Sequence, residues 1–204
     1  MKIGLYFGTF NPIHVGHLVI ANYMAQYTDL DQVWLVVTPQ NPLKLKSTLL
    51  PDYHRLALVS EAVAHNSKLR ASDIEFKLTQ PNYTSTTLAY LKEKHPEHHF
   101  SMIMGEDNLR TFHKWYNFEQ LLQNYTFYVY PRVLTTQEEQ EVEDIGLQPE
   151  VSLHQHPNIV FCTEAPVMKV SSSFVRQSIK DGKDTRYLLT EPVFKYIDEM
   201  NFYK

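Results

Sequence analysis

The sequence predicts an α/β fold built on a doubly wound parallel sheet. Short apolar runs alternate with segments of helical periodicity along the 204 residues. The apolar runs are nearly continuous, which is typical of parallel strands covered by helices on both faces. A phosphate-binding type of motif also follows the first apolar run, where open α/β folds place their ligands. Strand–helix alternation of this kind requires right-handed crossovers.

The first half of the chain contains three predicted strands. Residues 33–37 are apolar throughout, and residues 15–27 carry apolar side chains at helical spacing. A stretch with three prolines and two lysines forms a loop, and Asp52 is the expected N-cap of the helix after it. In order we predict a strand at 2–7, a helix at 15–27, a strand at 32–38, a loop at 39–51, a helix at about 53–65 and a weaker strand near 69–76.

The second half continues the alternation and ends in helices. Ser85 or Thr84 is the expected cap of a helix that Pro96 terminates. The acidic run from Glu138 to Asp144 indicates an exposed insertion or a short helix. In order we predict a helix at about 86–95, a strand at 99–104, a helix at 118–123, a strand at 125–130, a polar segment at 134–156, a strand at 159–162 and helices at 171–180 and 192–200.

Length and composition indicate a single domain over residues 1–204, with about 171–204 as a small C-terminal helical part. The net charge of −4 disfavours a general nucleic-acid binder. No apolar run approaches the ~20 residues that span a membrane, and no signal peptide precedes the first strand. With Cys162 as the single cysteine, we expect a cytoplasmic protein. The sequence permits a homo-oligomer without requiring one.

The first chemistry-bearing motif is the decapeptide GTFNPIHVGH at residues 8–17. Its histidines, His14 and His17, are three residues apart at a predicted helix start, so they share one face. Unpaired N–H groups and the helix dipole favour phosphate there, and Gly16 leaves room for a nucleotide to approach. Two histidines alone make an incomplete metal site, so we predict none. Two histidines with a purely structural role remain the alternative.

A second motif, KVSSSFVR, lies at residues 169–176. Its serines open a predicted helix, and Arg176 lies about one turn inside it. This is a second helix start that offers N–H and hydroxyl donors to phosphate, with a guanidinium that binds phosphate bidentately. Taken alone, the motif is better explained as an ordinary serine-capped helix with a surface arginine. Together, the two motifs predict that the two ends of the chain clamp one polyphosphate.

These two motifs resemble the paired signatures of the HxGH nucleotidyltransferase superfamily, which has a Rossmann-like fold. Within it the chain is most similar to the bacterial nicotinate-mononucleotide adenylyltransferases. That narrower resemblance rests on Pro42-Leu43-Lys44, on the segment 83–88, and on Gly105-Glu106-Asp107 followed by Trp115. It covers residues 1 to about 200, and 134–156 matches least.

The resemblance implies transfer of AMP from ATP to nicotinate mononucleotide, giving deamido-NAD and pyrophosphate in NAD biosynthesis. ATP would carry Mg²⁺, and no nucleic acid or membrane partner is expected. The implied catalytic residues are His14, His17, Lys44 and Arg176. The implied ATP-binding residues are Gly8, Thr9, Phe10, Gly16, Gly105, Asp107, Ser171, Ser172 and Ser173. The implied acceptor-binding residues are Asn11, Thr86, Thr87 and Trp115.

The chain departs from the family pattern at several positions. Thr86 stands where an acidic residue is usual, and Leu43 stands where a histidine commonly precedes the loop lysine. The family's Arg-Pro near the fourth strand occurs here as Pro131-Arg132. Three alternatives therefore stay open: a transferase with another acceptor, such as nicotinamide mononucleotide, a non-catalytic nucleotide-sensing module, and a metal-dependent hydrolase that uses the histidines.

Overall fold

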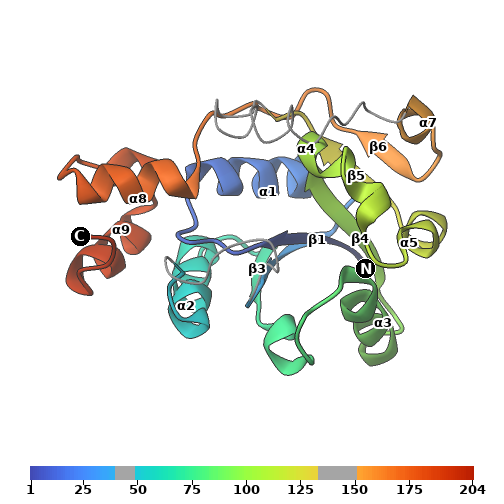
Figure 1. The fold of residues 1–204 in the computed structure, drawn as a ribbon, viewed down its shortest axis with the longest axis horizontal. Helices are drawn as coiled ribbons and strands as arrows, with labels where there is room; N and C mark the ends of the chain where they lie inside the picture. The colour runs from blue at the N-terminus through green and yellow to red at the C-terminus, as the bar shows by residue number, and fades with distance from the viewer. Residues whose placement is uncertain (40–48, 133–150) are drawn as a thin grey trace.

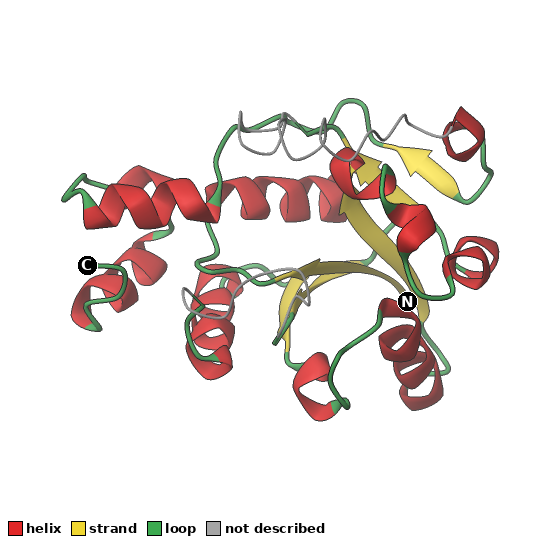
Figure 2. Cartoon of the chain, viewed as in Figure 1, coloured by secondary structure: helices red, strands yellow, loops and turns green. Residues whose placement is uncertain are grey.

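The computed structural model describes residues 1–39, 49–132 and 151–204, and it contains a six-stranded sheet (Figures 1 and 2). The strand order is β3-β2-β1-β4-β5-β6, and every neighbouring pair is parallel. This is the doubly wound order, so the predicted fold class is confirmed. The strands are β1 (Lys2–Gly8), β2 (Gln32–Val37), β3 (Leu69–Ser72), β4 (His99–Gly105), β5 (Phe127–Tyr130) and β6 (Ile159–Phe161).

Helices cover both faces of this sheet, as the unbroken apolar runs predict. In β2, Val33 and Leu35 belong to one hydrophobic cluster and Trp34 to the other. Helices α1 (Val15–Tyr27) and α2 (Asp52–Val63) contribute to the first cluster. Helices α3 (Thr84–Lys94) and α5 (Phe118–Asn124) contribute to the second. The remaining helices are η2 (Ile74–Lys77), α4 (Glu106–Leu109), η3 (Phe112–Lys114), α7 (Val151–His154), α8 (Ser172–Lys180), η4 (Arg186–Leu188) and α9 (Glu191–Glu199).

The C-terminal helices α8 and α9 lie together at the end of the molecule beside α1, far from β6 and α7 (Figure 1). Their buried side chains Val175, Val193 and Ile197 belong to the same hydrophobic cluster as Ile20 and Met24 of α1. The C-terminal part therefore shares its core with the sheet. No described helix has the length and apolar character needed to cross a bilayer.

Most predicted elements are found, but three boundaries were wrong. Asp52 is the first residue of α2 and not its N-cap, and its carboxylate pairs with Arg55. Helix α3 begins at Thr84 after Tyr83, so neither Thr84 nor Ser85 is the cap. The strand predicted near 69–76 ends at Ser72, because a 3-10 turn follows. The predicted loop 39–51 and polar segment 134–156 lie largely outside the described residues, although 151–154 are helical.

Candidate active site

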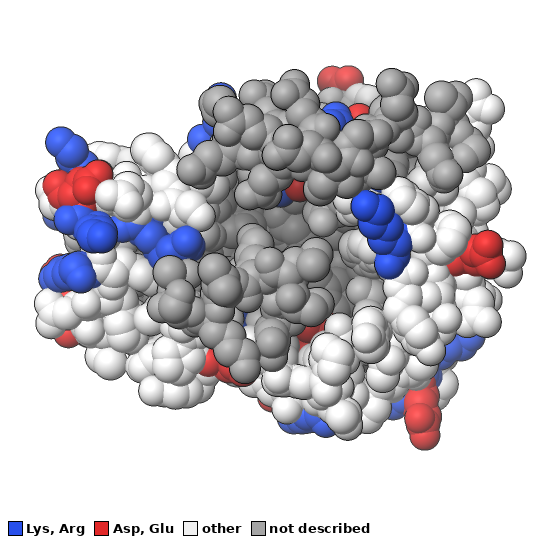
Figure 3. Space-filling view, in the orientation of Figure 1, with Lys and Arg blue, Asp and Glu red and all other residues white. Residues whose placement is uncertain are grey.

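The site is built where the strand order reverses, between β1 and β4. Connections from these two neighbouring strands run to opposite sides of the sheet, which leaves a crevice at their carboxyl ends. Gly8 ends β1 and Gly105 ends β4. These two glycines, which were predicted to bind ATP, therefore lie at the edge of the sheet formed by the carboxyl ends of the strands. In the face seen in Figure 3, Lys and Arg side chains of the described residues gather at the α8–α9 end, and a further basic side chain lies on the opposite side of the centre.

His14 and His17 lie together at the start of α1. Their rings are stacked, with centroids 3.8 Å apart and planes 26° apart. The main-chain N–H of His14 donates to Nδ1 of His17 at 3.3 Å, which fixes the orientation of the second ring. The Phe10 ring meets the His17 ring edge-on, at a centroid distance of 5.0 Å. The three-residue spacing thus produces a pair of adjacent imidazoles, as the sequence predicts.

The His14 ring is buried, with only 4% of the residue exposed. Burial, together with the positive charge of Arg132, lowers the pKa of His14 to about 4. The imidazole is therefore neutral near pH 7. Its Nδ1 has no hydrogen-bond partner among the described residues. A neutral ring of this kind donates one hydrogen bond without bringing a charge into the site.

Gly16 and Gly8 are explained by the packing of these rings. A Cβ atom on Gly16 would lie 3.0 Å from Nδ1 of His14, and one on Gly8 would lie 2.9 Å from the ring of Phe10. Phe10 itself has a φ of 45° and is 1% exposed. The ring of this predicted ATP-binding residue therefore lies in the protein interior, where it supports His17.

The second motif contacts the first directly. Ser171 is the N-cap of α8, and its Oγ accepts the N–H of Phe174 at 3.1 Å. Ser172 donates its hydroxyl to the carbonyl of Pro12 at 2.9 Å. Arg176 donates to the carbonyl of Asn11 at 2.7 Å and to Oγ of Ser173 at 3.1 Å. The two motifs, at opposite ends of the sequence, therefore form one structural unit.

At the end of β4, Gly105 and Asp107 lie next to Arg132. A guanidinium N–H of Arg132 donates to the Asp107 carboxylate at 2.5 Å. A side chain on Gly105 would overlap that carboxylate, so glycine is required beside it. Asp107 is the second residue of α4, whose N-cap is Gly105. Asp107 therefore does not cap this helix.

Comparisons with known proteins agree with this geometry. The cytidylyltransferase-like family model matches residues 5–178. The chain is 57% identical to the "Probable nicotinate-nucleotide adenylyltransferase" of Flavobacterium johnsoniae and 55% identical to that of Flavobacterium psychrophilum, with 100% of both chains covered in each case. The chain belongs to the nicotinate-nucleotide adenylyltransferase family.

The fold is also that of a solved structure. A structure titled "Plasmodium falciparum nicotinic acid mononucleotide adenylyltransferase complexed with NaAD" superposes with a TM-score of 0.73. It covers 99% of this chain and 97% of its own, at 18% identity. At that identity the match concerns the fold alone. The fold of this nucleotidyltransferase is thus shared with a distant adenylyltransferase.

The residues predicted for the acceptor side of this adenylyltransferase lie in different environments. Thr86 is exposed, whereas Thr87 is fully buried and donates its hydroxyl to Oε1 of Glu75 at 2.9 Å. The Trp115 ring is half-buried and packs edge-on against Phe112, with centroids 5.4 Å apart. The Thr87 side chain therefore braces the start of α3 from within. Lys44, the predicted loop donor, lies outside the described residues.

Asn11 is also buried, at 3% exposure. Its Oδ1 accepts the N–H of Leu50 at 3.2 Å and the hydroxyl of Tyr203 at 2.7 Å. Asn11 thus joins the histidine motif to Leu50, in the segment before α2, and to Tyr203, in the segment after α9. Its predicted contact with the acceptor stays a prediction, and these bonds give it a structural task.

Two arginines near the site were assigned no role from the sequence. Arg132 was left without a role because the family's Arg-Pro is reversed here, yet it pairs with Asp107 and influences His14. Arg55 is fully buried and donates to the carbonyls of Thr9 at 2.6 Å and Thr38 at 2.8 Å. The sequence offered one signal for this burial, the helical spacing. Arg55 lies three residues before Leu58 and four before Val59, and both of these side chains are buried.

Proposed function

We propose that this adenylyltransferase transfers AMP from MgATP to nicotinate mononucleotide, forming deamido-NAD and pyrophosphate. One observation carries the proposal. The start of α8 bonds the carbonyls of Pro12 and Asn11, in the loop that leads from β1 to the stacked imidazoles of His14 and His17. Two helix starts and a guanidinium at one point favour a polyphosphate. The names of the relatives and of the NaAD complex support the choice of acceptor.

The reaction needs no enzyme nucleophile. A phosphate oxygen of the mononucleotide attacks the α-phosphorus of ATP in line, and the bond from that phosphorus to the pyrophosphate oxygen breaks. The difficulty is to hold two polyanions together and to stabilise the charge that develops on the phosphoryl oxygens. Preorganised donors meet both needs.

We assign this donor role to four side chains, those of His14, His17, Arg176 and Lys44. His14 and His17 would donate to oxygens of the transferred phosphoryl group, and the low pKa of His14 makes it a neutral donor. Arg176 and the serines at the start of α8 would hold the terminal phosphates. Lys44, from the segment after β2, would complete the set.

Mg²⁺ enters this scheme as part of the substrate. Imidazole, hydroxyl and N–H groups dominate the described site, and they suit phosphate oxygens better than a hard cation. The carboxylate of Asp107 is paired with Arg132. We therefore infer that phosphate oxygens and water hold the ion.

On the acceptor side, we propose that the pyridine ring lies near Thr86 and Trp115. Thr86 is exposed and Trp115 is half-buried, so both retain surface for a ligand. An indole face stacks on a cationic pyridinium ring. Asp107, at the other side of the crevice, would accept a hydrogen bond from a ribose hydroxyl of ATP.

Pyrophosphate release from ATP and Mg²⁺ tests the proposal, with nicotinate mononucleotide in one arm and nicotinamide mononucleotide in the other. We expect release to depend on an acceptor and to be faster with the nicotinate form, since only that form carries the carboxylate. Equal rates would contradict the assigned acceptor. ATP binding without release over both acceptors would favour a nucleotide-sensing module instead.

A further inference from the structure

A cluster of metal-ligating side chains lies at the edge of the sheet opposite the active site. His95 follows the last residue of α3, and Glu97 and His98 lie in the turn that leads into β4. Strand β4 reaches the active site only at its other end, at Gly105. Seven residues of extended strand span about 20 Å, so the cluster is separate from the adenylyltransferase site.

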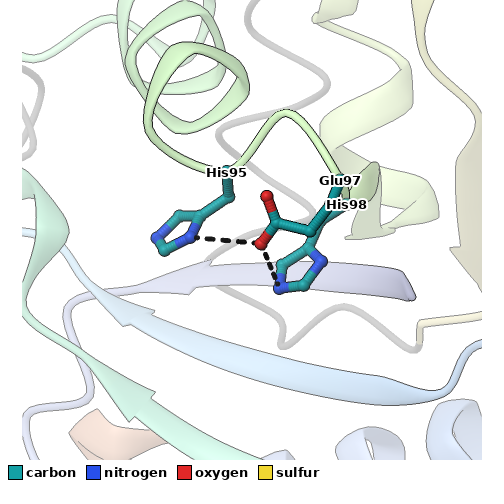
Figure 4. Close-up of side chains that lie close together, drawn as sticks. All are labelled: His95, Glu97 and His98. Carbon is teal, nitrogen blue, oxygen red and sulfur yellow. Dashed lines mark ion pairs between the residues drawn. The ribbon is translucent and has the colours of Figure 1, made fainter.

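The three side chains converge on one point (Figure 4). One ligand atom from each lies within 4.8 Å of the others. Oε1 of Glu97 is 3.3 Å from Nε2 of His98 and 3.8 Å from Nδ1 of His95. In a tetrahedral zinc site, bonds of about 2.1 Å place neighbouring ligands about 3.4 Å apart. The separation between Oε1 of Glu97 and Nε2 of His98 is close to that value, and the separation between Oε1 of Glu97 and Nδ1 of His95 is somewhat longer.

The surrounding residues hold the imidazoles in place. The planes of the His95 and His98 rings are within 9° of parallel, with centroids 5.5 Å apart. The Trp34 ring meets both of them edge-on, at 5.9 Å and 6.5 Å. The Arg70 guanidinium lies over the Trp34 ring, 4.8 Å from its centroid. Ligands fixed in this way need little reordering to accept an ion.

The position also favours a cation and gives it access. His95 lies at the C-terminus of α3, where the helix dipole presents partial negative charge. The Glu97 side chain is 61% exposed, whereas those of His95 and His98 are 30% and 17% exposed. The carboxylate thus faces solvent, and the imidazoles lie behind it.

We propose that His95, Glu97 and His98 bind one divalent transition-metal ion of the zinc type, with water as the fourth ligand. Two imidazoles and a carboxylate suit Zn²⁺, Co²⁺ or Ni²⁺, whereas Mg²⁺ prefers oxygen ligands. Nδ1 of His98 is buried without a hydrogen-bond partner among the described residues. Loss of the hydrogen bond to the second ring nitrogen of a ligating histidine lowers metal affinity roughly 10–100-fold. We therefore expect this site to bind zinc more weakly than a structural zinc centre does.

Titration of the full chain with Co²⁺, followed by its visible absorption, and competition by Zn²⁺ test the proposal. The N-terminus must carry no histidine tag, because the carbonyl of Met1 bonds the N–H of His99 beside the cluster. We expect one ion per chain and no displacement by millimolar Mg²⁺. At a hundredfold excess of Zn²⁺ over Kd, Tm should rise by roughly 5–10 °C.

Three variants separate this site from nonspecific binding. His98→Gln and Glu97→Gln should each lower the affinity at least tenfold, with unchanged pyrophosphate release. His99→Gln is the matched control, since His99 is exposed and outside the cluster. Absence of stoichiometric binding, or equal losses in His99→Gln and His98→Gln, would overturn the proposal. If His98→Gln does not fold, the exposed Glu97 variant decides alone.

Discussion

At the residue scale, the histidine pair shows how one short motif carries both packing and chemistry. The His14 ring is buried against Gly16, and it stacks on His17, which Phe10 supports. Burial keeps His14 neutral near pH 7. The His14 ring is therefore suited to donate a hydrogen bond to a phosphoryl group without bringing a positive charge into the site.

The first prediction concerns His17. Removing one well-aimed donor costs roughly 3–4 kcal/mol of transition-state stabilisation, so His17→Ala should reduce turnover by about a hundredfold or more. Its Tm should stay close to that of the parent protein. Pyrophosphate release under saturating substrates measures the effect, and His65→Ala, at an exposed position, is the control. A near-normal rate in His17→Ala would contradict the donor role.

The second prediction concerns Glu75, which is 2% exposed beneath the start of α3. Burial raises its pKa to about 7, although hydrogen bonds from Thr87 and Asn82 act to lower it. The folded state therefore holds this proton more tightly than the unfolded chain does, and the associated stability is lost as pH rises from about 4.5 through 7.

Glu75→Gln removes this titration. Relative to the parent protein, the free energy of unfolding of the variant should increase by about 2.5 kcal/mol between pH 5 and pH 8. Urea denaturation across that range measures the difference, with the exposed Glu61→Gln as control. Parallel pH curves for Glu75→Gln and the parent would show that folding does not shift the pKa of Glu75.

The sequence predicted the adjacency of the two histidines better than the burial of individual side chains. Spacing alone places His14 and His17 on one face, because helix geometry is local. The interior positions of Thr87 and Asn11 could not be predicted in this way. Thr87 is buried by Glu75 and Asn11 is held by Tyr203, and both contacts depend on tertiary packing.

At the scale of elements, Arg55 ties the segments around the site together. From α2 it reaches the loop after β1 through the carbonyl of Thr9, and the end of β2 through Thr38. It also bonds the carbonyl of Leu50 at 3.0 Å. The Arg55 side chain therefore holds the residues that follow β1 and β2. It also holds the residues at the end of the connection that leads from β2 into α2.

The third prediction is that Arg55→Met destabilises the protein by about 3 kcal/mol, because several buried carbonyls lose their donor. Arg55→Lys should recover only part of this, since an ammonium lacks the planar fork that reaches these carbonyls together. Urea denaturation gives the values. Lys195→Met, on an exposed face of α9, is the control. A loss no larger than that control's would remove the assigned role of Arg55.

Elements with strong local signals were predicted well. Helix α1 has the predicted bounds, 15–27, because its apolar spacing and its starting motif agree. Strand β3 was predicted too long, since the apolar Ile74 and Phe76 belong to a 3-10 turn that alternation alone does not distinguish. The Asp52 side chain, which was expected to cap α2, instead pairs with Arg55 one turn further along the same helix.

At the scale of the whole molecule, the C-terminal helices share the core on one face of the sheet. Val175, Val193 and Ile197 pack in the same cluster as α1. Both tryptophans, Trp34 and Trp115, belong to the cluster on the other face. The sequence contains no further tryptophan, so its fluorescence reports on the sheet side opposite α8 and α9.

This arrangement gives the fourth prediction. Unfolding in urea should give coincident transitions by tryptophan fluorescence and far-UV circular dichroism, because the C-terminal helices pack in the same hydrophobic cluster as α1 and α2, and the strands of the sheet contribute to both clusters. A separate early phase in circular dichroism, without a change in fluorescence, would show that 171–204 unfold as an independent unit. Repeating the experiment with Tyr203→Phe tests whether the bond to Asn11 strengthens this coupling.

The bonds from Arg176 and Tyr203 to Asn11 also have a consequence for the conformational entropy of the histidine loop. Arg176 and Tyr203 are separated from Asn11 by 165 and 192 residues of sequence. Closing chain loops of that length costs conformational entropy when the chain folds. The loop that carries the two histidines is therefore ordered by the tertiary fold and not by its local sequence.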